Sequence, residues 1–143
     1  MAKEKAKSAQ QPAPMPKALG GVIPYLDVRD ANAAAEFYIK AFGAKEVFRM
    51  PNDASGRTMH IHLRINGGSL MLSDPFPEHG HPTKAPQAYT LHLAVDDIDA
   101  WWARATQAGA EVVMPVDMMF WGERYGQLRD PFGVAWSMGQ PNS

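Results

Sequence analysis

VRDANAAAEFYIKAFGAKEV, residues 28–47, decides the fold because VDDIDAWWARATQAGAEVV, residues 95–113, repeats its pattern. The offset between the two copies is 67 at Val28 and Val95 and 66 at Gly43 and Gly109. Similarity at a nearly constant spacing indicates two copies of one supersecondary unit. Two such copies on one chain usually build a pseudo-symmetric shell around a shared site.

Each copy predicts the same order of elements. In the first copy a short strand ends at Val28, and a helix begins after the N-cap Asp30 and ends at Gly43. Three strands are then expected over residues 45–50, 58–65 and 69–73. The second copy predicts a strand over 89–95, a helix over 98–108, and strands over 111–114, 125–129 and 134–138. The helix residues expected to pack against the sheets are Phe37, Tyr38, Phe42, Trp101, Trp102 and Ala105.

The remaining segments set the boundaries of the domain. Residues 1–19 are rich in Lys, Pro and Ala and predict a disordered leader. Residues 20–140 predict a single domain, with module one over about 20–74, a proline-rich linker over 75–86, and module two over about 87–140. Residues 115–122 predict a long apolar connection, which either folds over the core or forms the lid or wall of a ligand pocket.

Composition excludes several classes of function. The chain has 143 residues, a net charge of −1 and no cysteine, which excludes disulfides, thiol catalysis and thiolate metal sites. Charges of both signs are interspersed outside the leader, so no nucleic-acid partner is expected. The chain also lacks an apolar run of about 18 residues, so no membrane association is expected. We expect a cytoplasmic protein.

The duplicated units resemble those of the vicinal-oxygen-chelate superfamily, which includes glyoxalase I, extradiol dioxygenases and bleomycin-resistance proteins. The second half resembles the PhnB-like branch, and the motifs that carry this resemblance are residues 95–98 (VDDI), 119–127 (MFWGERYGQ) and 129–137 (RDPFGVAWS). The resemblance implies an α+β fold in which two tandem βαβββ modules form an incompletely closed, eight-stranded, barrel-like sheet with the helices outside. It also implies a site in the concavity and pairing as a homodimer, with modules either exchanged or side by side.

In this superfamily, metal enzymes take their ligands from the first and fourth strands of each unit. The resemblance places these positions at Ile23, Leu72, Thr90 and Ser137. Aliphatic side chains cannot bind a metal, and hydroxyl groups are weak ligands for divalent ions. We therefore expect no metal or other cofactor, unless displaced histidines supply the ligands.

Another set of polar side chains is available to line the concavity. His60, His62 and Arg64 alternate with Met59, Ile61, Leu63 and Ile65, and we expect the apolar set to face the helix and the polar set to face the cavity. The expected ligand-binding residues are Tyr25, His60, His62, His92, Phe120, Trp121, Tyr125 and Gln127, with Arg64 and Arg129 nearer the rim. His79 and His81, in the linker, are expected to be solvated. Glu78, in the same linker, adds only a weak indication of metal binding.

Three functions remain open at this point. The first is a metal-free protein that binds or sequesters a small amphipathic or aromatic molecule, as the antibiotic-binding relatives do. The second is a metal-dependent lyase, isomerase or dioxygenase with ligands from the His60, His62 and His92 group. The third is a structural or regulatory protein with a vestigial cavity.

Overall fold

The chain folds as two similar modules, each with one helix and four strands. The computed structural model describes residues 15–141. The first module contains β1 (Tyr25–Asp27), α2 (Ala31–Phe42), β2 (Lys45–Arg49), β3 (Ile61–Ile65) and β4 (Gly68–Ser73). A linker with the short 3-10 helix η1 (Pro77–His79) leads to β5 (Leu91–Ala94), α3 (Ile98–Ala108), β6 (Glu111–Met118), β7 (Glu123–Arg129) and β8 (Ala135–Pro141). The predicted order of elements is confirmed in both copies.

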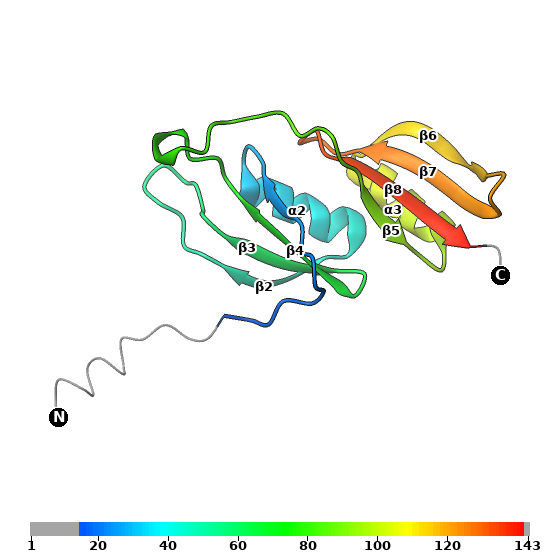
Figure 1. Cartoon of the computed structure of the whole chain (residues 1–143), viewed down its shortest axis with the longest axis horizontal. Coiled ribbons are helices and arrows are strands. Elements are labelled where there is room, and N and C mark those ends of the chain that lie inside the picture. Colours follow the sequence, from blue (N-terminus) through cyan, green and yellow to red (C-terminus); the bar gives the residue numbers. More distant parts are fainter. Residues whose placement is uncertain (1–14, 142–143) are drawn as a thin grey trace, which may run out of the picture.

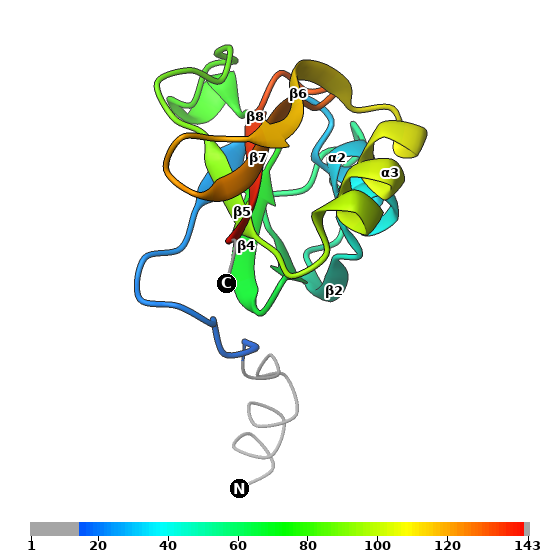
Figure 2. The ribbon, with the colours of Figure 1, turned by 90° about the vertical axis from the view of Figure 1, so that its right-hand side faces the viewer.

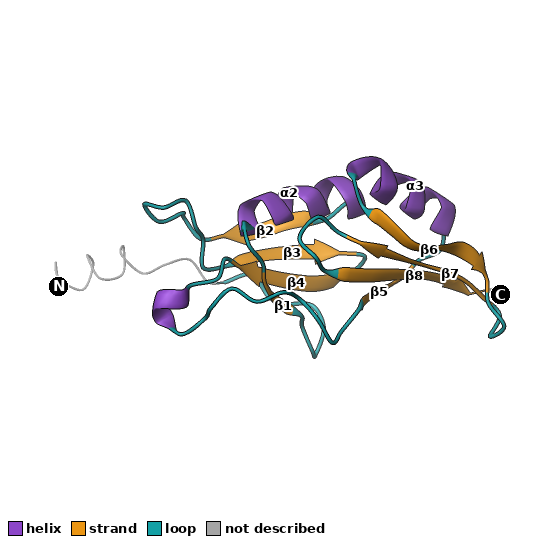
Figure 3. Cartoon of the chain, turned by 90° about the horizontal axis from the view of Figure 1, so that it is seen from above, coloured by secondary structure: helices purple, strands orange, loops and turns teal. Residues whose placement is uncertain are grey.

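The strands form two four-stranded sheets with the orders β1-β4-β3-β2 and β5-β8-β7-β6. In each sheet the first and fourth strands are parallel neighbours and the other pairs are antiparallel. Figure 1 shows the two sheets in opposite halves of an elongated molecule, and Figure 3 shows α2 and α3 along the same side of both. The expected α+β fold, with two tandem modules and an open sheet, is confirmed.

Both helices begin and end where the repeat predicts. The Asp30 carboxylate accepts a hydrogen bond from the Ala33 amide, and the Asp97 carboxylate accepts one from the Ala100 amide. These bonds satisfy amides in the first turn that have no partner within the helix. Gly43 and Gly109 end the helices with φ values of 68° and 116°, a conformation in which a side chain is strained.

The two modules are joined through their helices, which lie on the same side of the strands (Figure 2). Arg104, on α3, donates from Nε to the Lys40 carbonyl at 2.9 Å and from Nη2 to the Ile39 carbonyl at 3.3 Å. Carbonyl groups in the last turn of a helix lack partners within the helix and carry partial negative charge. Arg104 therefore caps the end of α2 from the other module.

An aromatic cluster extends the core across the module boundary. The Trp136 ring, from β8, lies 4.4 Å from the Phe42 ring and 5.3 Å from the Tyr38 ring, both on α2. The predicted core residues Tyr38, Phe42 and Ala105 are buried, while Phe37, Trp101 and Trp102 are partly buried against the same core. The sheets are thus held in one globule although their strands do not pair.

The expectation of a long loop over residues 115–122 was wrong. Strand β6 continues to Met118, so the connection to β7 contains only residues 119–122. Pro115 is accommodated because the register of β6 against β7 shifts between Met114 and Asp117. A proline is tolerated at such an irregularity, where no amide is required for the ladder.

The predicted strand over residues 58–65 also begins later than expected, at Ile61. Thr58 is fully buried, and its polar groups are satisfied: its amide donates to the Asp74 carboxylate and its hydroxyl donates to the Met50 carbonyl. Met59 is 52% exposed and does not face the helix. The irregular pairing around Thr58 ends the alternation on which that expectation depended.

The predicted leader falls partly outside the described residues, since those begin at residue 15. Residues 15–24 have no regular secondary structure, but Leu19 exchanges hydrogen bonds with Ser69 on β4. The predicted boundary at residue 19 therefore lies inside a segment that contacts the first sheet. Within residues 15–141, no helix is long and apolar enough to cross a membrane.

Candidate functional site

Each sheet has one face packed on the helices and an open face that points away from them. In the first sheet Leu26, Ile61 and Leu72 are buried on the helix side. Met71 lies between its ladder partners Tyr25 and His62. Residues paired across a ladder present their side chains on the same face, so these three share the open face.

Tyr25 and His60 form the first group of predicted site residues. The Tyr25 hydroxyl donates to the Met59 carbonyl at 3.0 Å and lies 2.9 Å from Nδ1 of His60. Because the single hydroxyl proton of Tyr25 is donated to Met59, the Tyr25 oxygen accepts a hydrogen bond from Nδ1 of His60. The His60 tautomer is therefore the one with hydrogen on Nδ1. Burial, and secondarily the nearby Asp27 carboxylate, raises the pKa of Tyr25, and burial lowers the pKa of His60. Both side chains therefore present neutral polar groups.

His62, predicted to line the same cavity, is 1% exposed and lies apart from this pair. Its Nε2 is 2.7 Å from the Ser69 hydroxyl, which also accepts a hydrogen bond from the Leu19 amide at 2.7 Å. The Ser69 hydroxyl still has its proton and a second lone pair, so it bonds to Nε2 as donor or acceptor according to the histidine tautomer. Burial, followed by the Arg64 and His60 charges, lowers the pKa of His62.

The second sheet brings five predicted residues into one group, which we call the His92–Tyr125 cluster. The His92 and Tyr125 rings stack with their centroids 6.0 Å apart, and Trp121 meets the Tyr125 ring edge-on at 5.5 Å. Gln127 donates to the Tyr125 hydroxyl at 3.2 Å. Phe120 packs edge-on against Trp121 at 5.0 Å, yet 97% of Phe120 is exposed. The cluster is an aromatic surface bordered by the Gln127 amide and by the Glu123 carboxylate, which accepts from Nε1 of Trp121 at 2.9 Å.

The two groups stay separate within one chain. Across residues 15–141, no hydrogen bond or ring contact joins Tyr25 and His60 to the His92–Tyr125 cluster. Figure 1 explains this, because the two sheets occupy opposite halves of the molecule. Within one chain the predicted residues therefore form separate groups on the two open faces, and the structure does not bring all eight together.

One of the four presumed metal positions was assigned to the wrong residue. Ser137 pairs with His92 and Gln127, and the residue with the equivalent partners in the first sheet is Met71. Leu72 points to the helix side, where it is fully buried. The error arises because the two strand connections differ in length by one residue. Four residues lie between Arg64 and its ladder partner Ser69, whereas five lie between Arg129 and its partner Ala135. A shift of one residue places a strand side chain on the opposite face.

The residues at these positions do not fit a divalent metal. Ile23 has no lone pair and Met71 offers only a thioether, which hard divalent ions avoid. Thr90 is exposed just before β5, and the Ser137 hydroxyl is 2.7 Å from Nδ1 of His92. No three His, Asp or Glu side chains in the described part of the chain are grouped so that they can hold a metal ion.

A cavity of about 400 Å³ lies beside Tyr25 at one end of the first open face. Its wall includes Met59 and Phe76, which were not among the expected ligand-binding residues, and His79 and His81, which are exposed as expected. Phe76 is buried, and the Arg57 guanidinium lies over its ring at 4.3 Å while bonding to Glu78. An aromatic residue within a proline-rich linker is the signal that could have identified this wall.

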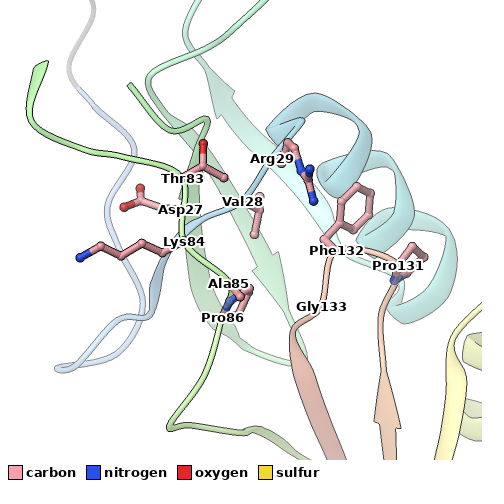
Figure 4. Close-up of a pocket in the computed structure, with 10 residues that line it drawn as sticks. All are labelled: Asp27, Val28, Arg29, Thr83, Lys84, Ala85, Pro86, Pro131, Phe132 and Gly133. Atoms are coloured by element: carbon pink, nitrogen blue, oxygen red, sulfur yellow. The ribbon is translucent and has the colours of Figure 1, made fainter. Parts of the chain in front are cut away.

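Two further cavities lie where the modules meet. One of about 370 Å³ is enclosed by the linker, the segment after β1 and the β7–β8 turn. Figure 4 shows Arg29 and Phe132 on one side of it and Thr83 and Lys84 on the other. The second cavity, of about 200 Å³, is lined by ten residues: Pro24, Ile65, Gly68, Ser69, Leu70, Thr90, Leu91, His92, Leu93 and Trp136. Of these two cavities, the smaller includes a predicted site residue, His92.

The β7–β8 turn is positioned by Arg129 and Asp130. Arg129, expected near the rim, donates to the Gly133 carbonyl at 3.1 Å. One carboxylate oxygen of Asp130 accepts from the amides of Phe132 and Val134. The DPFG sequence is thus a turn motif, as its composition indicates.

Comparison with known proteins places this geometry in a family. The family model of the Glyoxalase/Bleomycin resistance protein/Dioxygenase superfamily matches residues 24–138. An uncharacterized protein of Mycobacterium bovis is 45% identical over 124 residues, which cover 82% of this chain and 81% of the relative.

Solved structures show the same fold. TioX from Micromonospora sp. ML1 superposes with a TM-score of 0.68 at 27% identity, covering 85% of this chain and 98% of TioX. The PhnB protein from Bacillus cereus superposes with a TM-score of 0.66, covering 85% of this chain and 99% of the other. At 21% identity, this second likeness concerns the fold alone. The family match over residues 24–138 shows that the chain belongs to the glyoxalase/bleomycin resistance protein/dioxygenase superfamily.

Proposed function

We propose that this protein binds and sequesters a small amphipathic or aromatic molecule on its open faces without the help of a metal. The observation that carries the proposal is the His92–Tyr125 cluster, in which stacked rings adjoin a few hydrogen-bonding groups. Ligand sites are typically apolar and aromatic, with a few polar groups that fix orientation. The cavity beside Tyr25 offers the same combination on the first sheet.

Two Ser–His contacts raise the alternative of nucleophilic catalysis, but their burial argues against it. The Ser137 hydroxyl lies 2.7 Å from His92, and the Ser69 hydroxyl lies 2.7 Å from His62. Ser137 is 2% exposed and Ser69 is 7% exposed, so neither oxygen is open to a substrate. A nucleophile must reach the reacting atom, and its histidine is normally oriented by a third group. We therefore assign these pairs a structural role.

A metal-dependent lyase, isomerase or dioxygenase is the second candidate. It requires His60, His62 and His92 to converge on one ion. His62 is buried beside Ser69, and His92 belongs to the other sheet. Within residues 15–141 these histidines do not meet, and metal analysis of the dialysed protein tests this function.

We further propose that the protein acts in the cytoplasm as a homodimer in which two copies complete each site. The group of predicted residues on each open face would then be one half-site, and the tip of the β6–β7 hairpin exposes Met118, Phe120 and Trp121. A two-fold axis would set the first open face of one copy against the second open face of the other. Both half-sites would then line a shared concavity.

A fluorescence titration against aromatic and amphipathic compounds tests the binding function. We expect at least one compound to change the emission of the wild-type protein but to have less effect in Trp121→Phe, because Trp121 lies in the cluster. Tyr125→Ala should weaken binding about tenfold, since loss of an aromatic anchor commonly costs more than 1 kcal/mol. Tyr89→Ala is the control, because Tyr89 is a 43% exposed tyrosine that makes no ring contact with the cluster. Failure of a broad panel to bind the folded protein would contradict the proposal.

A further inference from the structure

The segment before β1 makes contacts with the first sheet that resemble those of a bound ligand. The Leu19 amide donates to the Ser69 hydroxyl at 2.7 Å, and the Leu19 carbonyl accepts from the Ser69 amide at 3.0 Å. Arg64 donates from Nη2 to the Lys17 carbonyl at 3.1 Å. We call residues 17–19 the strap.

The strap leaves Arg64 incompletely bonded. Its Nε atom is buried and makes no hydrogen bond within the described residues. A buried donor without a partner is destabilising, because it has lost its hydrogen bonds to water and gained none in return. The Nε and Nη2 hydrogens of a guanidinium point in parallel, so they match two oxygens of one carboxylate. The Lys17 carbonyl has one oxygen and satisfies only Nη2.

An apolar space lies beside Ser69, the ladder partner of Arg64. Ser69, which holds the strap, also lines the cavity of about 200 Å³ at the module boundary. The other walls of that cavity include Ile65, Leu70 and Trp136, and His92 of the second sheet. A polar end near Arg64 and an apolar body in this cavity together describe an amphipathic molecule.

We propose that the strap is an internal occupant of a carboxylate subsite, and that the ligand is an amphipathic carboxylate that displaces it. The inference rests on the proposed binding function and specifies the chemical class of the ligand. The carboxylate bonds to Nε and Nη2 of Arg64, and the Leu19 amide loses its contact with Ser69 when the strap leaves. Binding is thereby coupled to release of the segment that precedes β1.

Calorimetric titration with 2-naphthoate and its neutral analogue 2-naphthamide tests the carboxylate subsite in the full chain. We expect wild type to prefer the carboxylate, and Arg64→Gln to weaken naphthoate about tenfold to hundredfold with little effect on naphthamide. Arg64→Lys, which keeps the charge but loses the planar pair of donors, should lie between wild type and Arg64→Gln. Equal effects of Arg64→Gln on both compounds, or no effect on either, would overturn the subsite.

Hydrogen exchange at the Leu19 amide tests displacement of the strap. We expect faster exchange in the presence of saturating naphthoate, and in Ser69→Ala without ligand. Ser69→Ala should also bind naphthoate several times more tightly. The substitution removes the hydrogen bond from the Leu19 amide without changing the charge, so the strap competes less well with the ligand. Thr106→Ala is the control, because the Thr106 hydroxyl bonds to the Trp102 carbonyl within α3.

The outcomes separate this inference from the binding function. If naphthoate binds but Leu19 exchange stays constant, the strap does not compete and the inference is overturned, while the binding function stands. If neither naphthyl compound binds wild type or Ser69→Ala, the carboxylate class is wrong, and the wider fluorescence panel decides the binding function.

Discussion

The Tyr38 hydroxyl, in the first module, donates to the Asp130 carboxylate, in the second, at 2.6 Å. The same carboxylate oxygen accepts from Nε1 of Trp136 at 2.9 Å, and the other oxygen accepts from two amides of the β7–β8 turn. Burial, followed by the Asp130 charge, raises the pKa of Tyr38, so the phenol stays protonated. One buried carboxylate thus connects the turn, the Trp136 side chain and helix α2.

Tyr38→Phe should lower the free energy of unfolding by about 1.5–3 kcal/mol, because hydrogen bonds to charged groups contribute that much. The ring packing is retained, so the loss reports the hydroxyl and the unpaired carboxylate oxygen. Urea unfolding at neutral pH measures the change. Tyr89→Phe is the control, since Tyr89 is 43% exposed, and it should change stability by no more than about 0.5 kcal/mol. Equal effects of the two substitutions would contradict the role of Asp130.

Local signals made most of the fold predictable. The caps at Asp30 and Asp97, and the terminal glycines Gly43 and Gly109, specify both helices without reference to distant residues. Contacts between the modules are different, because they join residues far apart in sequence. The sequence marked Tyr38 as a core residue, but no local pattern shows that its hydroxyl meets Asp130.

A close contact within the second module gives another stability prediction. A Cβ atom added at Gly126, on β7, would lie 2.6 Å from the Trp102 ring and 3.0 Å from Val116. Gly126→Ala should therefore cost about 1–3 kcal/mol through overpacking. Gly139→Ala, on neighbouring β8, should cost less because a Cβ there meets only the flexible end of Glu123. Thermal or urea unfolding of the two variants distinguishes them, and the opposite order would contradict the packing of Trp102.

The site was less predictable than the fold, for two physical reasons. The one-residue difference between the β3–β4 and β7–β8 connections moves the position equivalent to Ser137 from Leu72 to Met71. Strand periodicity identified His62 as a residue of the open face, but it does not reveal the strap that bonds to its partner Ser69. The alternation of side chains along a strand shows which residues share one face of the sheet. It does not show which irregular segments, such as the strap, cover that face.

Stability should decrease as the pH falls from about 7.5 to 5.5, with His62 as a contributor. Burial lowers the pKa of His62 from its ordinary value of 6.5, so the unfolded chain binds a proton more readily than the folded chain. The contribution of His62 is fully present above pH 6.5 and is lost as the pH falls through the folded pKa, by at most about 1.4 kcal/mol per pH unit. Urea unfolding across this range should show a weaker dependence in His62→Gln than in wild type. His81→Gln, an exposed linker variant, should retain the wild-type dependence, and an unchanged slope in His62→Gln would contradict this assignment.

Elemental analysis of the dialysed protein should find far less than one metal equivalent per chain. The reason is the donor set, because Ile23, Met71, Thr90 and Ser137 do not supply the carboxylate or imidazole ligands of a divalent site. Adding zinc, nickel or manganese should not raise the midpoint of thermal unfolding, since a ligand stabilises only the state that binds it. One equivalent per chain or per dimer, lost in His62→Ala, would instead support the metal-dependent alternative.

Sedimentation velocity should show a homodimer that depends on the β6–β7 hairpin tip. Phe120 is 97% exposed and Trp121 is 51% exposed, and adjacent exposed aromatic residues mark interaction surfaces more often than isolated ones do. Phe120→Ser should weaken association by about tenfold or more, as removal of a buried aromatic anchor does. Val22→Ser provides the control, because Val22 is 95% exposed but lies in the segment before β1, away from the hairpin. A wild-type monomer at all concentrations, or equal weakening by both substitutions, would contradict a dimer built through this tip.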